Sequence, residues 1–237
     1  MHDLTFLKKP KRVKFGIKFL DNLAPYGFPI NSFILISGEA GISKSLLLQN
    51  IMISFIKRKY NCIYICADDH PLSIYQNIKS NFNIRNKIFF SKFLFLNLFN
   101  TKFHGQLSNN YFKIINIYFN KDIFEILNLL INVVDTTLKE GKKQIIIFDS
   151  ITEILSKYDP NSVLELIKNI IYEICKKRLI PLFASFHFGI KSFEDFEQII
   201  EGYCDGVFDL RYDPSFMQKG ILIKQLRIRK LRNVFHD

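Results

Sequence analysis

Eight residues near the beginning of the chain differ at a single position from a phosphate-binding loop. The loop pattern is Gly, any four residues, Gly-Lys, and then Ser or Thr. Here the run is Gly38-Glu39-Ala40-Gly41-Ile42-Ser43-Lys44-Ser45, so Ser43 replaces the second glycine. The apolar run 31–37 before it and the longer apolar run 45–56 after it predict a strand, a glycine loop and a helix in succession.

This order of elements gives each part of the loop a predicted role. The backbone N–H groups of such a loop and the N-terminus of the following helix face phosphate groups. The Lys44 ammonium group would contact the β- and γ-phosphates, and the Ser45 hydroxyl would hold Mg²⁺. Residues 38–45 are therefore predicted to bind a nucleotide. The alternative is a glycine-containing turn that precedes a lysine by chance.

Ser43 affects how well such a loop can form. A glycine is usually kept where the backbone needs a positive φ angle or a close approach to the ligand. A side chain at such a position costs about 1–2 kcal/mol. We therefore expect nucleotide binding to survive in a loop of poorer geometry.

A second motif supplies a carboxylate. The segment 143–150 is an apolar strand that ends in Asp149 and is followed by Ser150. A buried strand of this kind, which resembles a Walker B element, carries its carboxylate to the strand end, where the carboxylate supports the Mg²⁺ shell. Some buried strands end in Asp by chance, but the position of this one about a hundred residues after the loop favours a nucleotide site. Asp149 is thus a predicted nucleotide and metal residue together with Ser45.

The composition is that of one globular domain. The chain has 237 residues, of which 48% are hydrophobic, and no linker-like tract divides it. The four cysteines form no Cys-x-x-Cys pair and no metal-ligand spacing with the histidines, so we expect free thiols in a reducing cytoplasm. The apolar segments are interrupted before they reach about 18 residues, and we expect no membrane insertion.

The net charge of +11 permits an anionic partner such as nucleic acid. The basic residues gather near the two ends, at Lys8, Lys9, Lys11, Arg12, Lys14, Lys224, Arg227, Arg229, Lys230 and Arg232. A solvated surface explains most such charge runs, so the charge by itself does not assign a partner.

Strand and helix patterns alternate along the chain. The predicted strands are 31–37, 61–67, 144–148, 180–186, 206–212 and 220–232. The predicted helices are 45–56, 71–82, 121–140, one that Asp159-Pro160-Asn161 opens, and 194–203. Segment 87–119 is predicted to form two short strands around the polar loop 100–110. Repeated β-α-β units imply a mainly parallel sheet with helices on both faces and ligands at the carboxyl ends of the strands.

Several segments resemble one family in order along the chain. Residues 13–31 resemble the family's entry segment, which has Gly-Ile, then Leu-Asp, then Gly-Ile-Pro. Residues 205–212 resemble its Ala-Asp-Gly-Val-Ile-Val-Leu strand. Residues 229–236 resemble its terminal Lys-Met-Arg-Gly motif with a downstream His. On these segments and the two motifs, the chain resembles a single-domain member of the RecA superfamily, close to the KaiC-like ATPases of archaea and bacteria. Only 87–119 has no clear counterpart.

The resemblance implies roles for further residues. Asp68, with Asp69, falls where these ATPases carry a Glu pair that orients or deprotonates the attacking water. Aspartate is one methylene shorter, which sets its carboxylate back; a charged turn before Pro71 is the alternative. Ser185 and His187 follow the strand after which relatives place a polar sensor residue, and a strand-end histidine with a purely structural role is the alternative for His187.

Lys230 and Arg232 correspond to a basic pair that reaches the γ-phosphate of a neighbouring subunit in KaiC-like rings. Two residues apart on a strand, they project from one face of it. The alternative is a solvated edge strand that lysines protect from aggregation. Asn233 replaces the glycine of the family motif.

Together, these observations predict an α/β fold of the RecA-like P-loop NTPase type, with a mainly parallel central sheet, helices on both faces and antiparallel C-terminal strands. We expect a basic N-terminal segment, 1–12, and one KaiC/RecA-like domain, 13–237. The resemblance implies ATP and Mg²⁺ as ligands and a homo-oligomer, with a hexameric ring as one form.

The predicted function is slow ATP hydrolysis or a nucleotide-dependent assembly switch, because Ser43 and Asp68 depart from the catalytic pattern. One alternative is a RadA-paralogue-like recombination accessory that binds DNA. Another is a non-catalytic ATP-binding regulator that resembles the accessory protein of the archaellum motor.

Overall fold

A single eight-stranded sheet organises the protein. The computed structural model describes residues 11–85, 87–98, 112–117, 122–219 and 221–234. The strands run in the order β10-β9-β3-β8-β7-β4-β5-β6. All neighbouring pairs are parallel except β9 and β10, which are antiparallel. The bounds are β3 Phe33–Gly38, β4 Asn61–Cys66, β5 Phe93–Asn97, β6 Lys113–Asn116, β7 Gln144–Asp149, β8 Leu182–His187, β9 Gly206–Tyr212 and β10 Lys224–Leu231.

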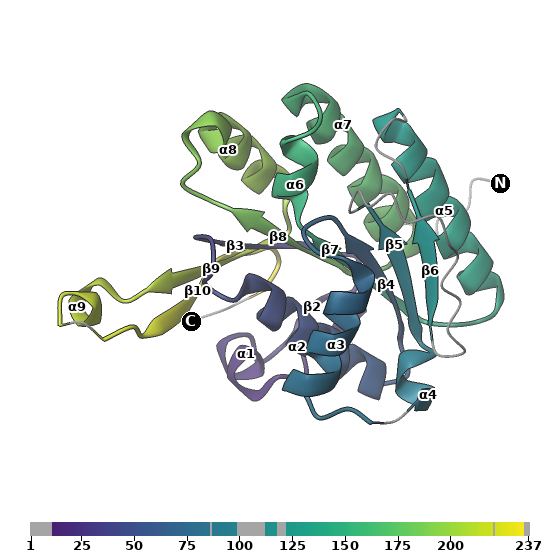
Figure 1. Cartoon of the computed structure of the whole chain (residues 1–237), viewed down its shortest axis with the longest axis horizontal. Helices are drawn as coiled ribbons and strands as arrows, with labels where there is room; N and C mark the ends of the chain where they lie inside the picture. The colour runs from purple at the N-terminus through teal and green to yellow at the C-terminus, as the bar shows by residue number, and fades with distance from the viewer. Residues whose placement is uncertain (1–10, 86, 99–111, 118–121, 220, 235–237) are drawn as a thin grey trace.

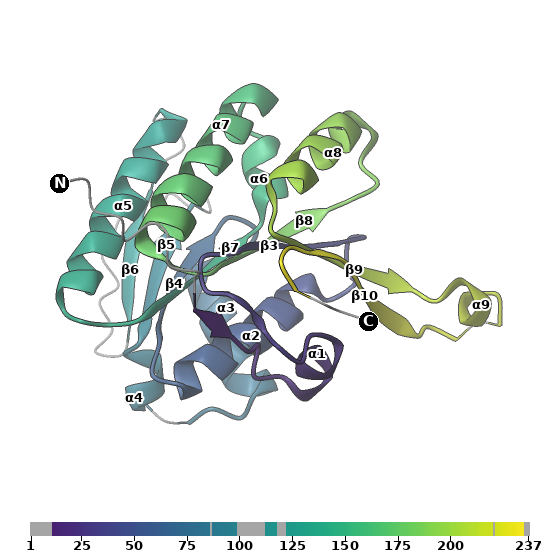
Figure 2. The same ribbon diagram turned by 180° about the vertical axis from the view of Figure 1, so that it is seen from behind.

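Helices cover both faces of the sheet (Figure 1). One face carries α5 Ile123–Lys139, α6 Ile151–Leu155, α7 Pro160–Ile170, which continues into a π-helical segment Ile171–Lys176, a short 3₁₀ turn Lys191–Phe193, and α8 Glu194–Tyr203. The other face carries α1 Lys18–Leu23, α2 Lys44–Lys57, α3 Pro71–Asn81 and α4 Lys87–Phe90. Figure 2 shows the same two helical layers from behind.

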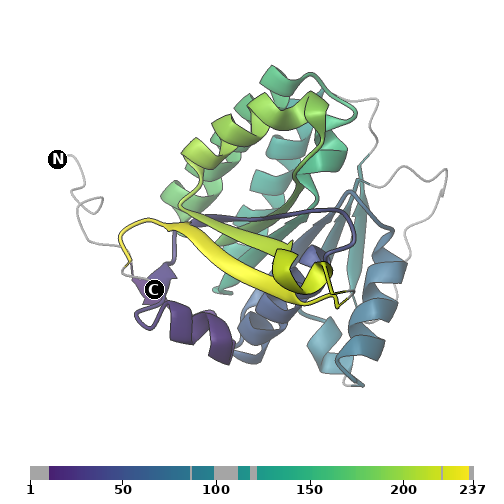
Figure 3. The ribbon, with the colours of Figure 1, turned by 90° about the vertical axis from the view of Figure 1, so that its left-hand side faces the viewer.

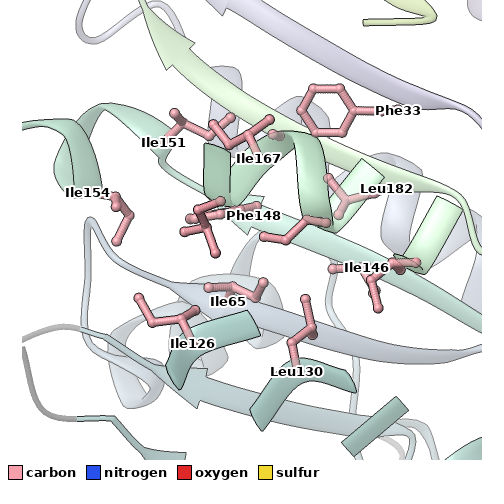
Figure 4. Close-up of a cluster of buried hydrophobic side chains, with 14 of the residues drawn as sticks. Phe33, Ile65, Ile126, Leu130, Ile146, Phe148, Ile151, Ile154, Ile167 and Leu182 are labelled. Atoms are coloured by element: carbon pink, nitrogen blue, oxygen red, sulfur yellow. The ribbon is translucent and has the colours of Figure 1, made fainter. Parts of the chain in front are cut away.

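The central strands are buried on both faces. Every residue of β3 and of β7 is buried, and both strands are nearly continuous apolar runs, as expected for parallel strands with helices on each side. Figure 4 shows Phe33, Ile146 and Phe148 of these strands facing Ile126 of α5 and Ile167 of α7. This core fixes the positions of the strand ends, which carry the polar residues of the predicted site.

Two small antiparallel pairs lie outside the β-α-β pattern. Strands β1 Arg12–Val13 and β2 Phe28–Pro29 form a two-stranded sheet, and α1 connects them along the chain. Strands β9 and β10 form a hairpin whose tip is the short helix α9 Pro214–Met217. Strand β10 is the outermost strand on this side of the sheet (Figure 3).

The predicted fold class is confirmed, and the differences concern short elements. The 87–119 segment contains the two expected strands as β5 and β6, whereas its polar loop 100–110 lies outside the described residues. The pair β1–β2 and helices α1, α4, α6 and α9 were not predicted, because elements of two to six residues give too little periodicity to detect. Within the described residues, no helix is both long and apolar enough to cross a membrane.

Candidate nucleotide-binding site

The carboxyl ends of β3, β4, β7 and β8 lie side by side. They form one edge of the sheet, which runs across the strands and not along an outer strand. Their registers pair Gly38 with His187 and Cys66 with Asp149. Because these strands are parallel, the residues that follow them also gather at this edge. The structure therefore brings together the loop 38–45, the Asp68 turn, Asp149 and His187, which lie far apart in the sequence.

Positive φ angles and one tight backbone contact shape the loop between β3 and α2. Gly38 has no room for a side chain, since a Cβ atom there would lie 2.7 Å from the carbonyl oxygen of Leu210. Gly41 has a φ angle of 77°. Ser43 has a φ angle of 76° and immediately precedes α2. Ser43 thus adopts the left-handed conformation that normally selects glycine, which costs about 1–2 kcal/mol.

The Ser43 side chain has a partner that the sequence did not indicate. Lys224, the first residue of β10, donates a hydrogen bond from Nζ to Ser43 Oγ over 2.6 Å. The start of β10 lies at this edge because β10 runs antiparallel to β9. Lys224 therefore places a further cation beside the loop, and Ser43 links the loop to the C-terminal hairpin.

Lys44 is buried, with 4% of its surface exposed. Its Nζ donates hydrogen bonds to the carbonyl oxygens of Gly38, at 2.9 Å, and Glu39, at 2.7 Å. Burial lowers the pKa of Lys44 to about 8, although the carboxylates of Asp149 and Asp68 favour its charged form. A buried ammonium group with a perturbed pKa beside two carboxylates is a feature of functional sites.

Asp149 is held in place from two neighbouring strands. Tyr64 of β4 donates a hydrogen bond from its hydroxyl to Asp149 Oδ2 over 2.8 Å, and Ser185 of β8 hydrogen-bonds to Asp149 Oδ1. The Asp149 side chain is 4% exposed. These contacts fix the carboxylate at the carboxyl end of β7. The structure thus places Ser185, one of the two candidate sensor residues, directly on Asp149.

Asp68 lies between Ser150 and His187. Ser150 donates a hydrogen bond to Asp68 Oδ1 over 3.1 Å, and His187 Nε2 lies 3.8 Å from Asp68 Oδ2. Burial, with a contribution from Asp149, raises the pKa of Asp68 to about 6. Burial, with a contribution from Lys44, lowers the pKa of His187 below its usual value of about 6.5. At neutral pH the pair is therefore an ionised carboxylate beside a neutral imidazole.

Asp69 and Ser45 occupy the flanks of this site. Asp69 accepts a hydrogen bond from the backbone N–H of His70 at 2.7 Å, so its carboxylate shapes the turn into α3. Ser45 is the second residue of α2 and is half-buried. A cavity of about 410 Å³ adjoins the loop on the other flank, and its lining includes Ser43, Leu46 and Lys224.

The oxygen groups at this edge suit Mg²⁺ in the company of phosphates. The described residues contain no cluster of three His, Cys, Asp or Glu side chains that could hold a metal ion by themselves. In nucleotide sites, however, Mg²⁺ takes one or two carboxylates together with phosphate oxygens and waters. Asp149 and the Ser45 hydroxyl are oxygen ligands of that kind, and both Asp149 oxygens accept hydrogen bonds from Tyr64 and Ser185.

Lys230 and Arg232 lie at the opposite edge of the sheet, where the parallel strands begin. Lys230 is paired with Val207 near the beginning of β9, and Arg232 follows the end of β10. Lys230 Nζ donates to the carbonyl oxygen of Glu201 over 2.6 Å, and Arg232 Nη2 donates to that of Gly202 over 2.6 Å. Both cations thus project toward the C-terminal end of α8 in the same subunit, where they complement the helix dipole.

Four partners of the predicted residues were not identified from the sequence. They are Tyr64, Lys224, Ser150 as a donor to Asp68, and Thr152, whose hydroxyl accepts the backbone N–H of His187 over 2.8 Å. Only Ser150 and Thr152 follow a motif closely enough for the sequence to suggest them. Tyr64 and Lys224 reach the site through strand order.

Comparisons with known proteins identify one family. Residues 13–237 match the family model described as "ATPase: KaiC". Over 68 residues the chain is 31% identical to UPF0273 proteins of Pyrococcus horikoshii and Pyrococcus furiosus, and over 69 residues it is 30% identical to one of Thermotoga maritima. Each alignment spans 29% of this chain and 28% of the relative.

Proposed function

Because the chain belongs to the KaiC family of ATPases, we propose that it binds ATP with Mg²⁺ at residues 38–45. It hydrolyses the ATP slowly and uses the bound nucleotide to control the assembly of its subunits. The main support is the buried Lys44, whose ammonium group bonds to the loop carbonyl oxygens of Gly38 and Glu39 and interacts electrostatically with Asp149 and Asp68. Calorimetric titration with ATP and Mg²⁺, followed by turnover and solution mass on the same preparation, tests the proposal. A protein that neither binds ATP nor changes mass with it would contradict it.

The triphosphate would lie over the loop N–H groups and the N-terminus of α2. Lys44 would exchange its two carbonyl partners for the β- and γ-phosphates, a change that stronger, charge-assisted bonds favour. Mg²⁺, when bound to Ser45 and Asp149, neutralises charge on the phosphate oxygens. The cavity of about 410 Å³ beside Ser43 offers room for the nucleoside.

Asp68 is the proposed general base. Its carboxylate has a pKa of about 6, close to the range in which a base is both ionised and effective at neutral pH. Ser150 fixes one of its oxygens, and the other lies toward His187. Aspartate reaches one methylene less far than glutamate, and a displacement of about 1 Å can cost about a hundredfold in rate. Slow hydrolysis is expected for this reason.

We predict a bell-shaped pH profile for kcat/KM with limbs near pH 6 and pH 8. Below about 6 Asp68 becomes protonated and cannot accept a proton, so the rate falls as pH falls. Above about 8 Lys44 becomes neutral and loses its attraction for phosphate, so the rate falls as pH rises. Turnover of Asp68→Asn is the control. If this variant retains the acid limb, the limb does not come from Asp68.

We predict that the double change Ser43→Gly with Asp68→Glu raises the steady-state rate, by about tenfold or more if positioning limits it. Glycine adopts the φ angle of 76° at position 43 without strain, and glutamate extends the base toward the attacking water. Steady-state turnover of the parent and the double variant measures the effect. An unchanged or lower rate would show that these departures do not limit catalysis.

Ser43→Ala separates two consequences of the change at position 43. Alanine keeps the strain of the left-handed backbone but removes the hydroxyl that bonds Lys224. If relief of strain is what matters, Ser43→Gly is faster than Ser43→Ala. Equal rates in the two variants would instead assign the effect to the lost contact with Lys224.

The assembly part of the proposal rests on Lys230 and Arg232. In their own subunit they lie at the edge of the sheet opposite the loop, because β10 begins beside Ser43 and ends near the start of β9. This separation does not favour action on the nucleotide of the same subunit. In a head-to-tail assembly, the pair would instead face the nucleotide of the next subunit, as an arginine finger does.

DNA binding is the second candidate function. Arg12, near the basic N-terminus, donates hydrogen bonds to the carbonyl oxygens of Gly27 and Asn233, so basic segments from both ends of the chain meet. Single-strand DNA binding measured across a salt titration tests this candidate. A steep loss of affinity with salt would support a phosphate-contacting surface.

A further inference from the structure

A second cavity lies at the edge of the sheet opposite the phosphate loop. It has a volume of about 630 Å³, and its lining residues come from the amino ends of β4, β5 and β7, from β6, and from the C-terminal half of α5. In Figure 1, α5 lies over β5 and β6, the last two strands on that side of the sheet. The cavity therefore shares no wall with the nucleotide site, which occupies the carboxyl ends of the strands.

The size and the walls of the cavity suit a small organic molecule. Pockets that bind such ligands measure about 300–1,000 Å³ and are mainly apolar with a few polar groups. Ile63, Leu94 and Ile115 supply apolar side chains from three adjacent strands, and Val133 does so from α5. Leu94 and Ile115 are only partly buried. The residues that the structure describes therefore leave part of the apolar surface of the cavity exposed.

Gln144 adds an unsatisfied polar group to this wall. Its side chain is 3% exposed, and its Nε2 donates to the Val134 carbonyl oxygen at 3.1 Å and to Thr137 Oγ1. The Val134 carbonyl can only accept, so it fixes which end of the amide is the donor. Gln144 Oε1 has no hydrogen-bond partner among the residues that the structure describes. Because this oxygen is fully buried, it lies behind the cavity surface and is not open to a ligand.

The charged residues around the cavity leave a positive excess. Its lining includes Lys92, Lys113 and Lys142 but only one acidic residue, Glu140. Lys142 forms an ion pair with Glu140, and Lys92 donates to the carbonyl oxygen of Ile56 at 3.3 Å. Lys113 is exposed and interacts electrostatically with the same Glu140, so the lysines still outnumber the acidic residue. An anionic group at the mouth of the cavity would therefore be favoured.

We propose that this cavity is a second ligand-binding site, for a small molecule with an apolar body and one anionic group. The apolar body packs on Ile63, Leu94 and Ile115, and the anion lies near Lys113. The proposal does not depend on ATP binding, because the two sites lie at opposite edges of the sheet.

The probe 8-anilinonaphthalene-1-sulfonate tests this site, because it combines apolar rings with a sulfonate. Fluorescence titration is expected to show one saturable equivalent per chain. Thr136→Trp should weaken binding at least about tenfold, because it introduces a large ring at an exposed cavity-lining position of α5. Asn128→Trp is the matched control, an exposed position on the same helix outside the cavity lining, and should leave binding unchanged.

Two further measurements separate this site from others. Lys113→Ala should weaken binding of the probe severalfold, and saturating ATP–Mg²⁺ should not displace it. In the unaltered protein, the δ1-methyl NMR signals of Ile63 and Ile115 should shift on addition of the probe. Unsaturable binding, equal affinity in Thr136→Trp and the parent, displacement by ATP–Mg²⁺, or unshifted methyl signals would each overturn the proposal.

Discussion

Lys44→Ala is expected to bind ATP–Mg²⁺ at least about a hundredfold more weakly than the parent protein. Each hydrogen bond from a charged group contributes about 1.5–3 kcal/mol, and Lys44 would make one to each of two phosphates. Since about 1.4 kcal/mol corresponds to a tenfold change in affinity, two such bonds account for the loss. Isothermal titration calorimetry of both proteins measures it directly.

The control for this experiment is Lys57→Ala, which removes an exposed lysine from the last position of the same helix. It should bind ATP as the parent does. Thermal melting without nucleotide shows whether Lys44→Ala is folded, because the change also removes one of the two donors to each of the carbonyl oxygens of Gly38 and Glu39. Equal affinity for ATP in Lys44→Ala and the parent would show that the loop assignment is wrong.

The double variant Lys230→Ala/Arg232→Ala is expected to lose the ATP-dependent part of assembly. A cation beside the γ-phosphate at a partly buried boundary forms charge-assisted bonds, and a gain of about 3 kcal/mol shifts subunit dissociation about a hundredfold. To act in this way, the pair must exchange the α8 carbonyl oxygens of its own subunit for the neighbour's phosphate. Sedimentation of both proteins, with and without ATP, measures the difference.

The same change also has an effect inside one subunit. Removing two cations from the C-terminal end of α8 should destabilise each subunit by about 1–2 kcal/mol, so melting temperatures without ATP must be compared first. Arg227→Ala, an exposed change on the same strand, is the matched control and should assemble as the parent does. If ATP tightens assembly equally in the double variant and the parent, the pair does not act across a subunit boundary.

Local patterns were sufficient for the fold class and for most of the central elements. Strands β3 and β7 are apolar runs because both of their faces are buried, and a continuous apolar run is visible in the sequence. The conformation at position 43 could also be predicted, because the loop pattern itself requires a residue with positive φ there. The antiparallel C-terminal pair was expected as well, although the tip helix α9 was too short to detect.

Contacts between distant segments could not be predicted in this way. Ser43 and Lys224 are separated by 181 positions, and Tyr64 and Asp149 by 85. Their meeting depends on the order of strands in the sheet, which periodicity along the chain does not encode. The same order placed Lys230 at the edge away from the loop.

Residues adjacent in the chain therefore specify the phosphate loop, the buried strand that ends in Asp149 and the alternation of strand and helix, because each depends on local backbone geometry and on burial. The partners of Ser43 and Asp149, the pKa values of Lys44 and Asp68, and the cavity beneath α5 arise only when the sheet assembles. They depend on desolvation and on distances between strands, which packing sets and no single segment contains.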